Sequence, residues 1–385
     1  MNTTRRTPSV VARGSVIIRA SRRSAVLVAM LALAGASLVA LSSPASATTF
    51  TVTNSNDSGL GSLRQAFADA SADVSGAHII EVQAGLGPIS LTSSELMYDN
   101  ASFMPLTIHG NGNTVNQTAA GFRAIHIVHG GLFTVDQLTI TGATAGGPGA
   151  GIDTDGAAVL VTNSTITGNS ATGAGGAIFG SSAVTVVNST ISGNSASVFG
   201  GGIAAQGVLT LVYTTVASNN APVASNILLF GTVSDNLSSF GSVVALPQGG
   251  GANCGLNQTT TSSQGYNFSD DTSCGFTAST DVENGGDPGL GALADNGGPT
   301  PTRLPLTGSP LIDAIPTASC QADGASGITT DQRGFPRPSP AGDPCEIGAV
   351  ELQPAPVPPP GPPTPPTPPP APPAAARGIA PRFTG

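Results

Sequence analysis

The sequence of 385 residues contains no tryptophan and no lysine, and only 9% of its residues are charged. All 13 basic residues are therefore arginines. So small a charged fraction is typical of an insoluble chain, or of one whose backbone polar groups are fully paired with each other. A long stack of β-strands provides such pairing, and the 51 glycines and 32 prolines are residues that favour turns.

The first 47 residues have the features of an export signal. Six arginines and no acidic residue lie within residues 1–24, and residues 25–41 form an uninterrupted run of apolar or small side chains. Residues 45–47, Ala-Ser-Ala, then supply a small-residue cleavage site. The run is short for a membrane span, so we expect cleavage after Ala47 and a secreted or cell-surface protein. An Arg-Arg pair at residues 22–23 resembles a twin-arginine signal without the usual phenylalanine, which leaves both the Sec and the twin-arginine routes open.

The chain that remains after cleavage is acidic. It has seven arginines against 22 aspartates and glutamates, a net charge of −15. Binding to nucleic acid needs a basic face that neutralises phosphates, and docking on anionic lipid needs a basic patch. We therefore expect neither partner.

Cysteine is scarce, and all four copies lie in the C-terminal third. An even number in an oxidising compartment predicts disulfides, with three pairings open. Pairing of neighbours would close loops of 20 and 25 residues, each worth about 3 kcal/mol in the chain-entropy model. A zinc site is the alternative, but there is no C-x-x-C motif and the histidines are distant, so we expect no metal and no cofactor. The four residues are Cys254, Cys274, Cys320 and Cys345.

An internal repeat of 25 residues dominates the middle of the chain. Residues 163–171, Asn-Ser-Thr-Ile-Thr-Gly-Asn-Ser-Ala, recur with one change at residues 188–196 and in a degraded form at residues 213–221. Apolar residues recur at four equivalent positions of successive repeats and so form four columns, with spacings of 25 to 27 residues. Two of these columns lie two residues apart, which is the periodicity of a β-strand. The columns are Ile125, Ile152, Ile178 and Ile203; Phe133, Val159, Val184 and Leu209; Val135, Val161, Val186 and Leu211; and Ile140, Ile166, Ile191 and Val216.

One such coil cannot bury its apolar residues alone, but stacked coils about 4.8 Å apart pair each strand with its equivalents above and below. The column Asn169, Asn194 and Asn219 then predicts an amide ladder at a turn. The glycines before Ile178 and Ile203 predict tight corners with positive φ.

The sequence therefore predicts an all-β chain, a right-handed parallel β-helix. Residues 61–70 carry apolar side chains at helical spacing and predict a capping helix, because the end of such a stack exposes its core. Residues 106–112 align with the coil around Ile140 at an offset of 32, which predicts an insertion. The expected parts are a signal peptide (1–47), an N-terminal cap (48–75), a β-helix of about nine coils (76–300), a C-terminal cap (301–352) and a disordered, proline-rich tail (353–385).

The two ends of the predicted body carry a family resemblance. Residues 50–54 with 61–66, Gly-Ser-Leu-Arg-Gln-Ala, resemble the N-terminal region of CSLREA-type exported β-helix proteins of bacteria, with Gly61 in place of cysteine and Gln65 in place of glutamate. Residues 295–351 are similar to the choice-of-anchor Q domain. The resemblance implies a pectin-lyase-like β-helix displayed outside the cell and often joined to a surface anchor, and it supplies no catalytic motif.

Charged residues of the C-terminal region suggest a further cluster. Arg333 and Arg337 with Asp313, Asp331 and Glu346 form either a salt-bridged cap or a ligand site. The proline-rich tail beyond them is either a spacer that leads to a cell-wall anchor or simply a disordered end.

One charged constellation lies inside the repeats. His126 follows Ile125 and Asp153 follows Ile152 in the same column, so both side chains should point outward on one face with Asp155. If the protein were an enzyme, His126, Asp153 and Asp155 would be the candidates for a general-base pair or a cation site. The alternative is a solvated surface contact between a histidine and an aspartate.

Two functions follow from these observations. The first is a non-catalytic, adhesive or structural β-helix at the cell surface or envelope, with extracellular glycans or surface proteins as partners. The second is a polysaccharide-active enzyme or glycan-binding protein that uses the His126 face. The sequence has no lysine to act as the base of a lyase, and it lacks the Asn-Thr-Asp, Gly-His-Gly and Arg-x-Lys motifs of polygalacturonases.

Overall fold

The structure is a computed structural model that describes residues 47–231, 236–257, 259–322, 325–354 and 385. The predicted signal peptide, apart from Ala47, and nearly all of the proline-rich tail lie outside the described residues.

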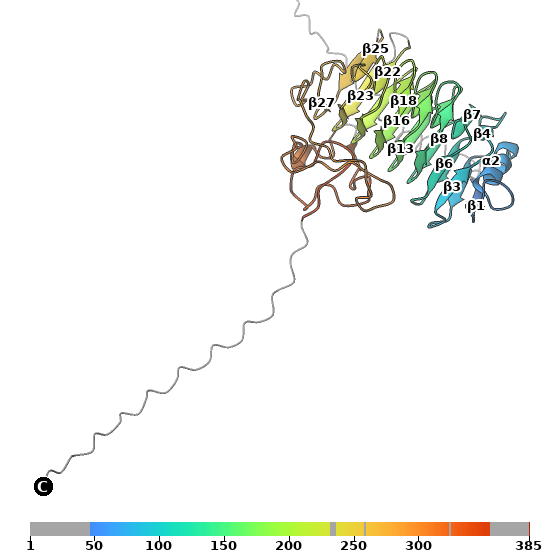
Figure 1. The fold of residues 1–385 in the computed structure, drawn as a ribbon, viewed down its shortest axis with the longest axis horizontal. Coiled ribbons are helices and arrows are strands. Elements are labelled where there is room, and N and C mark those ends of the chain that lie inside the picture. The colour runs from blue at the N-terminus through green and yellow to red at the C-terminus, as the bar shows by residue number, and fades with distance from the viewer. Residues whose placement is uncertain (1–46, 232–235, 258, 323–324, 355–384) are drawn as a thin grey trace, which may run out of the picture. The chain divides into compact units, whose positions relative to one another are not determined.

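The described chain forms a right-handed parallel β-helix of about eight turns, as predicted, with about one turn fewer than expected (Figure 1). Each full turn contributes one strand to each of three long sheets, here called A, B and C, and a short sheet D covers one corner. Every strand pair in these sheets is parallel and offset by one coil, so strands bury alternate side chains toward the central core.

The strands follow one another along each sheet as listed here. Sheet A contains β1 (Thr48–Val52), β2 (His78–Val82), β5 (Leu106–His109), β8 (Phe133–Asp136), β12 (Val159–Thr162), β16 (Val184–Val187), β20 (Leu209–Val212), β23 (Asn236–Phe240) and β26 (Thr260–Ser263). Sheet B contains β3 (Pro88–Leu91), β6 (Thr114–Gln117), β9 (Thr139–Thr141), β13 (Thr165–Thr167), β17 (Thr190–Ser192), β21 (Thr215–Ala217), β24 (Val243–Ala245) and β27 (Phe268–Ser269). Sheet C contains β4 (Leu96–Asp99), β7 (Ile125–His129), β11 (Ile152–Thr154), β15 (Ile178–Gly180), β19 (Ile203–Ala205), β22 (Ile227–Leu229) and β25 (Cys254–Leu256), and sheet D contains β10 (Thr144–Ala145), β14 (Ser170–Ala171) and β18 (Ser195–Ala196).

The four predicted apolar columns are confirmed. Ile152 pairs with Ile125 on one side and Ile178 on the other, and Ile166 pairs likewise with Ile140 and Ile191. All of these side chains are fully buried. Like residues therefore stack on like residues through the core, because the coil length hardly changes from turn to turn.

The predicted insertion before Ile140 is wrong. Ile108 pairs with Val135 in sheet A, an offset of 27, and Val115 is the residue that pairs with Ile140 in sheet B. The error arose because the strand at Ile108 and the strand at Ile140 both read Leu-Thr-Ile before a glycine-containing turn, although they belong to different sheets. Both offsets lie within the range of the later coils, so no insertion is needed there.

The amide ladder is confirmed and extends beyond its predicted column. Asn169 donates through Nδ2 to Oδ1 of Asn194 at 3.0 Å, and Asn194 donates to Asn219 at 3.0 Å. Asn219 then donates to Asn226, and Asn226 to Asn253. All five side chains are buried, so the ladder pairs polar groups that the turn removes from water.

The N-terminal end is closed by the predicted helix, α2 (Leu63–Ala72). Ser62 caps it by accepting a hydrogen bond from the backbone N–H of Gln65, and its buried face consists of Leu63, Ala66, Phe67 and Ala70. These residues belong to the same hydrophobic cluster as the core of the first coils, so the helix covers apolar surface that the first turn would otherwise expose.

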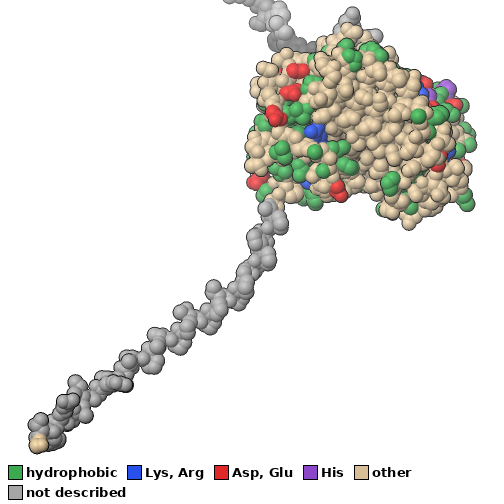
Figure 2. Space-filling model, viewed as in Figure 1, with side chains coloured by type: hydrophobic (Ala, Val, Ile, Leu, Met, Phe, Trp, Pro, Cys, Tyr) green, Lys and Arg blue, Asp and Glu red, His purple; other side chains and the backbone are tan. Residues whose placement is uncertain are grey.

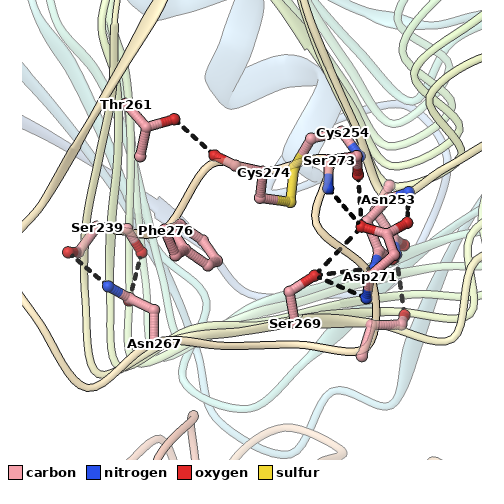
Figure 3. The surroundings of a disulfide bond; sticks show 12 residues. Ser239, Asn253, Cys254, Thr261, Asn267, Ser269, Asp271, Ser273, Cys274 and Phe276 are labelled. Atoms are coloured by element: carbon pink, nitrogen blue, oxygen red, sulfur yellow. Dashed lines mark hydrogen bonds between the residues drawn. A yellow bond between two sulfur atoms is a disulfide. The ribbon is translucent and has the colours of Figure 1, made fainter. Parts of the chain in front are cut away.

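The C-terminal end is closed by residues 270–283, held by the disulfide between Cys254 and Cys274 (Figure 3). The Thr261 hydroxyl donates to the carbonyl oxygen of Cys274, and the nearly buried Phe276 packs against the core. The last strand, β27, ends at Ser269, so the stack stops short of the predicted limit at residue 300. The second disulfide joins Cys320 to Cys345, so neighbours are paired in both cases.

Residues 284–352, which include the short helix η1 (Thr317–Ser319), pack against the flank of the stack. The fully buried Gln332 accepts a hydrogen bond from Thr190 at 2.7 Å and donates to Thr165 at 2.9 Å, which ties this segment to two coils. The Tyr213 hydroxyl donates to the carbonyl oxygen of Cys320. The region predicted as a C-terminal cap therefore lies beside the coils, at the lower left of the strands in Figure 1.

Among the described residues, no helix is both long enough and apolar enough to cross a membrane.

Candidate functional site

The predicted register of the candidate site is present in the structure. His126 and Asp153 are direct partners in β7 and β11 of sheet C, and Met97 of β4 is the partner of His126 on its other side. All three lie on the outward face, since the buried Leu96, Ile125 and Ile152 alternate with them.

Three acidic side chains surround the imidazole of His126. Nδ1 lies 3.3 Å from Oε1 of Glu95, and Nε2 lies 3.3 Å from Oδ2 of Asp155 and 3.9 Å from Oδ2 of Asp153. The hydrogen bond with Glu95, followed by the charge of Asp153, raises the pKa of His126 above its ordinary value. The same hydrogen bond lowers the pKa of Glu95. Both shifts favour an ion pair between His126 and Glu95.

Asp153 is a buried carboxylate, only 3% exposed. Its Oδ2 receives a short contact of 2.7 Å from Nε of Arg123, while its Oδ1 has no hydrogen-bond partner among the described residues. Burial raises the pKa of Asp153 to about 6, and the charges of Arg123 and His126 offset only part of that effect. The structure thus excludes a solvated surface contact at Asp153, the alternative interpretation of the sequence.

The turn at residues 146–149 covers Asp153. Nε of Arg123 also donates to the carbonyl oxygen of Pro148 at 3.0 Å. Gly149 has a φ of +63°, and a Cβ added there would lie 2.6 Å from the Cβ of Asp153. Only glycine lets the turn approach this closely, so the turn and Arg123 together shield the carboxylate from solvent.

The cluster of Glu95, Arg123, His126, Asp153 and Asp155 is therefore an internally paired network. Arg123 lies 3.6 Å from Glu95 as well as 2.7 Å from Asp153, so one guanidinium serves two carboxylates. Acid–base catalysis needs at least one group directed at a substrate, and here only Asp155, whose side chain is 61% exposed, is freely accessible. No group of three or more histidine, cysteine, aspartate or glutamate side chains in the described part of the chain could hold a metal ion.

Two members of this network were missed by sequence reasoning. Glu95 directly precedes β4, and Arg123 lies two residues before β7. A signal was available, because residues just before the strands of one column must lie at the same edge of the sheet. It was overlooked because β4 had not been recognised as part of the column that contains Ile125 and Ile152.

The remaining histidines form separate contacts. His129, half exposed, lies 2.7 Å from Asp99, and His109 lies 3.7 Å from Asp136, both near the surface. His78 is fully buried and its Nδ1 is 2.8 Å from the hydroxyl of Tyr98 beneath the N-terminal helix. Burial lowers the pKa of His78, which favours the neutral ring.

The arginine cluster of the C-terminal segment is a buried structural network. Arg333 pairs with Asp331 at 2.8 Å. Arg337 lies 3.9 Å above the ring of Tyr213 and 3.6 Å from Glu351, and donates to two carbonyl oxygens. Asp313, which was grouped with these residues in the sequence, is exposed and forms no ion pair with another described residue. Four of the five predicted residues thus meet in the folded segment.

A pair of carboxyl groups completes this network. Burial, followed by contact with Glu351, raises the pKa of Glu346 to about 8. Two buried carboxyl groups this close are most stable when one of them is protonated. Burial and this contact therefore favour the protonated form of Glu346.

In comparisons with known proteins, no protein-family model, no curated protein and no solved structure matches this chain. The parallel β-helix is consistent with a pectin-lyase-like fold, while the resemblance to CSLREA-type and choice-of-anchor Q proteins stays a prediction.

Proposed function

We propose that this chain is a non-catalytic, exported β-helix protein that acts at the cell surface or envelope as an adhesive or display body. The observation that carries the proposal is the state of Asp153. The strongest candidate for an acid or base is covered by the turn at Gly149 and paired with Arg123, so it cannot face a substrate in this conformation.

The outer surface of sheet A supports an adhesive role. From β5 to β26, one of its two outward columns consists almost entirely of hydroxyl side chains, spaced by one strand separation of about 4.8 Å. Tan covers most of the face seen in Figure 2, so uncharged polar side chains and backbone dominate there, and acidic side chains gather over the C-terminal segment. A regular array of hydroxyl groups offers many weak hydrogen bonds to a repeating partner. The column is Thr107, Thr134, Leu160, Thr185, Thr210, Ser238 and Ser262.

The two disulfides support an oxidising, extracellular location. Together with the predicted signal peptide, they favour a body exported through the membrane, with the proline-rich tail as a spacer to the cell wall.

Cell fractionation tests this proposal. Cells that express the full chain should yield a processed protein whose N-terminus lies near residue 48. Protease added to intact cells should digest this protein. Deleting residues 354–385 should shift this protein from the cell surface into the medium. An unprocessed protein retained in the cytosol would contradict the proposal.

One observation favours a second candidate, a polysaccharide-active enzyme. A pKa of about 6 at Asp153, beside His126, suits a group that exchanges protons near neutral pH. Product analysis on pectin, alginate and neutral polysaccharides, with and without calcium, distinguishes the two. Turnover that is lost in Asp153→Asn but kept in Asp136→Asn would establish the enzyme and overturn the non-catalytic proposal.

A further inference from the structure

A second feature of sheet C lies toward the C-terminal end of its outward face. The outward column that contains His126 and Asp153 continues as Phe179, Ala204, Leu228 and Gly255. A hollow of about 320 Å³ opens beside the last position, lined mainly by Phe199, Val223, Leu228, Phe230 and Leu256.

A second hollow of about 600 Å³ adjoins the first. Its lining combines the hydroxyl groups of Ser181 and Ser182 and the amide of Gln206 with the apolar Ala183 and Val208. Phe230 lines both hollows, and its ring centroid lies 5.5 Å from that of Phe179. The surface is thus an aromatic ridge with an apolar hollow on one side and a polar hollow on the other.

Exposed apolar groups continue around the first hollow. The side chains of Val198 and Val223 are 44% and 55% exposed. Ala204, Leu228 and the three phenylalanines form a hydrophobic cluster separate from the core of the coils. Stacking of the coils does not need this cluster, and apolar surface outside the core commonly marks a binding site.

We infer that this surface binds a neutral glycan, with a sugar ring against Phe230 and its hydroxyl groups toward Ser182 and Gln206. Sugar rings combine apolar C–H faces with hydroxyl groups, and aromatic side chains beside hydroxyl and amide groups match both. This inference rests on the proposed surface function and names its partner class.

Charge and backbone pairing argue against other occupants. Among the described residues, none that lines either hollow is charged, and the chain from residue 48 onward, with a net charge of −15, repels acidic polysaccharides. A peptide that adds a strand needs an open sheet edge. Strand β22, which forms the floor at Leu228, is paired on both sides, and at the end strand β25 the backbone N–H of Cys254 already donates to the hydroxyl of Ser273.

Titration calorimetry of the chain from residue 48 onward tests the inference, with hexamers of β-1,4-glucose, β-1,4-mannose and β-1,3-glucose as probes. Polygalacturonate serves as the acidic comparison. We expect at least one neutral hexamer to bind and Phe230→Ala to weaken that binding at least about tenfold. Phe230→Leu, which keeps apolar volume without a ring, should weaken it similarly. Phe103→Ala, at an exposed phenylalanine outside both hollows, should not change it.

Three outcomes would overturn the inference: no binding of any neutral hexamer, tighter binding of polygalacturonate, or binding unaffected by either change at Phe230. Dimerisation that is lost in Phe230→Ala would also overturn it, since the hollow would then hold a second copy. Each of these outcomes is compatible with the proposed function if protease added to intact cells still digests the protein. Cytosolic retention in that assay contradicts the proposed function separately.

Discussion

Replacing Asn194 by alanine should destabilise the β-helix more than any neighbouring polar substitution. The Asn194 side chain is 1% exposed and occupies the middle of the amide ladder. Its Oδ1 accepts from the backbone N–H of Asn169 at 3.1 Å and from the side chain of Asn169 at 3.0 Å. Its Nδ2 donates to the carbonyl oxygen of Ile166 at 2.9 Å and to Oδ1 of Asn219 at 3.0 Å.

The magnitude follows from the groups left without partners. Asn219 Oδ1 still accepts from the backbone N–H of residue 194, and Asn169 Nδ2 still donates to two carbonyl oxygens. The backbone N–H of Asn169 loses its acceptor, and the carbonyl oxygen of Ile166 loses the hydrogen bond from the side chain of residue 194. Each buried polar group without a partner costs about 1–3 kcal/mol, so the free energy of unfolding should fall by about 2–6 kcal/mol.

Urea unfolding of the oxidised chain from residue 48 onward measures this change. Asn116→Ala, at a half-buried outward position of β6, is the matched control and should change the free energy of unfolding by less than about 0.5 kcal/mol. If the Asn194 and Asn116 variants unfolded at the same urea concentration, the ladder would not carry the energy assigned to it.

Three further predictions concern the turn over the charged cluster, the carboxyl pair and the disulfide that closes the C-terminal end. Gly149→Ala should lower the melting temperature far more than Gly156→Ala, because both have positive φ but only the first would meet another residue within 4 Å; equal melting would refute the close approach of the turn. The folded-state pKa of Glu346, about 8, exceeds its ordinary value of 4.5, so the stability it confers is complete below about pH 4.5 and is lost as the pH rises through 8. Glu346→Gln should remove that loss in urea unfolding from about pH 5 to about pH 9, and an unchanged pH profile would contradict the assignment. Replacing Cys254 and Cys274 together by serine should cost about 3 kcal/mol, measured as a shift in the urea midpoint, and no shift would mean that the closed loop adds nothing.

The candidate site was predicted in part. Its two central residues, His126 and Asp153, could be placed side by side because they follow equivalent isoleucines of the repeat. Their partners Glu95 and Arg123 lie just before β4 and β7, and placing them requires that β4, which carries no repeat motif, be recognised as a strand of the same column. The burial of Asp153 depends on the path of the turn at Gly149, which carries no periodic signal.

The flank was less predictable than the coils. The columns of isoleucine and valine recur at a nearly constant spacing, and stacking of identical side chains converts that spacing directly into register. The contacts of Gln332 with Thr165 and Thr190 join residues more than 140 positions apart, and no local sequence pattern predicts them.

By itself, the sequence determined the parallel β-helix, its amide ladder and its N-terminal capping helix, because each depends on a short periodic pattern of side chains. Only the tertiary structure decided which cysteines pair, where the stack ends and which charges are buried. These features depend on where irregular turns bring distant residues together, and burial then sets the hydrogen bonds and the pKa values of the groups that meet there.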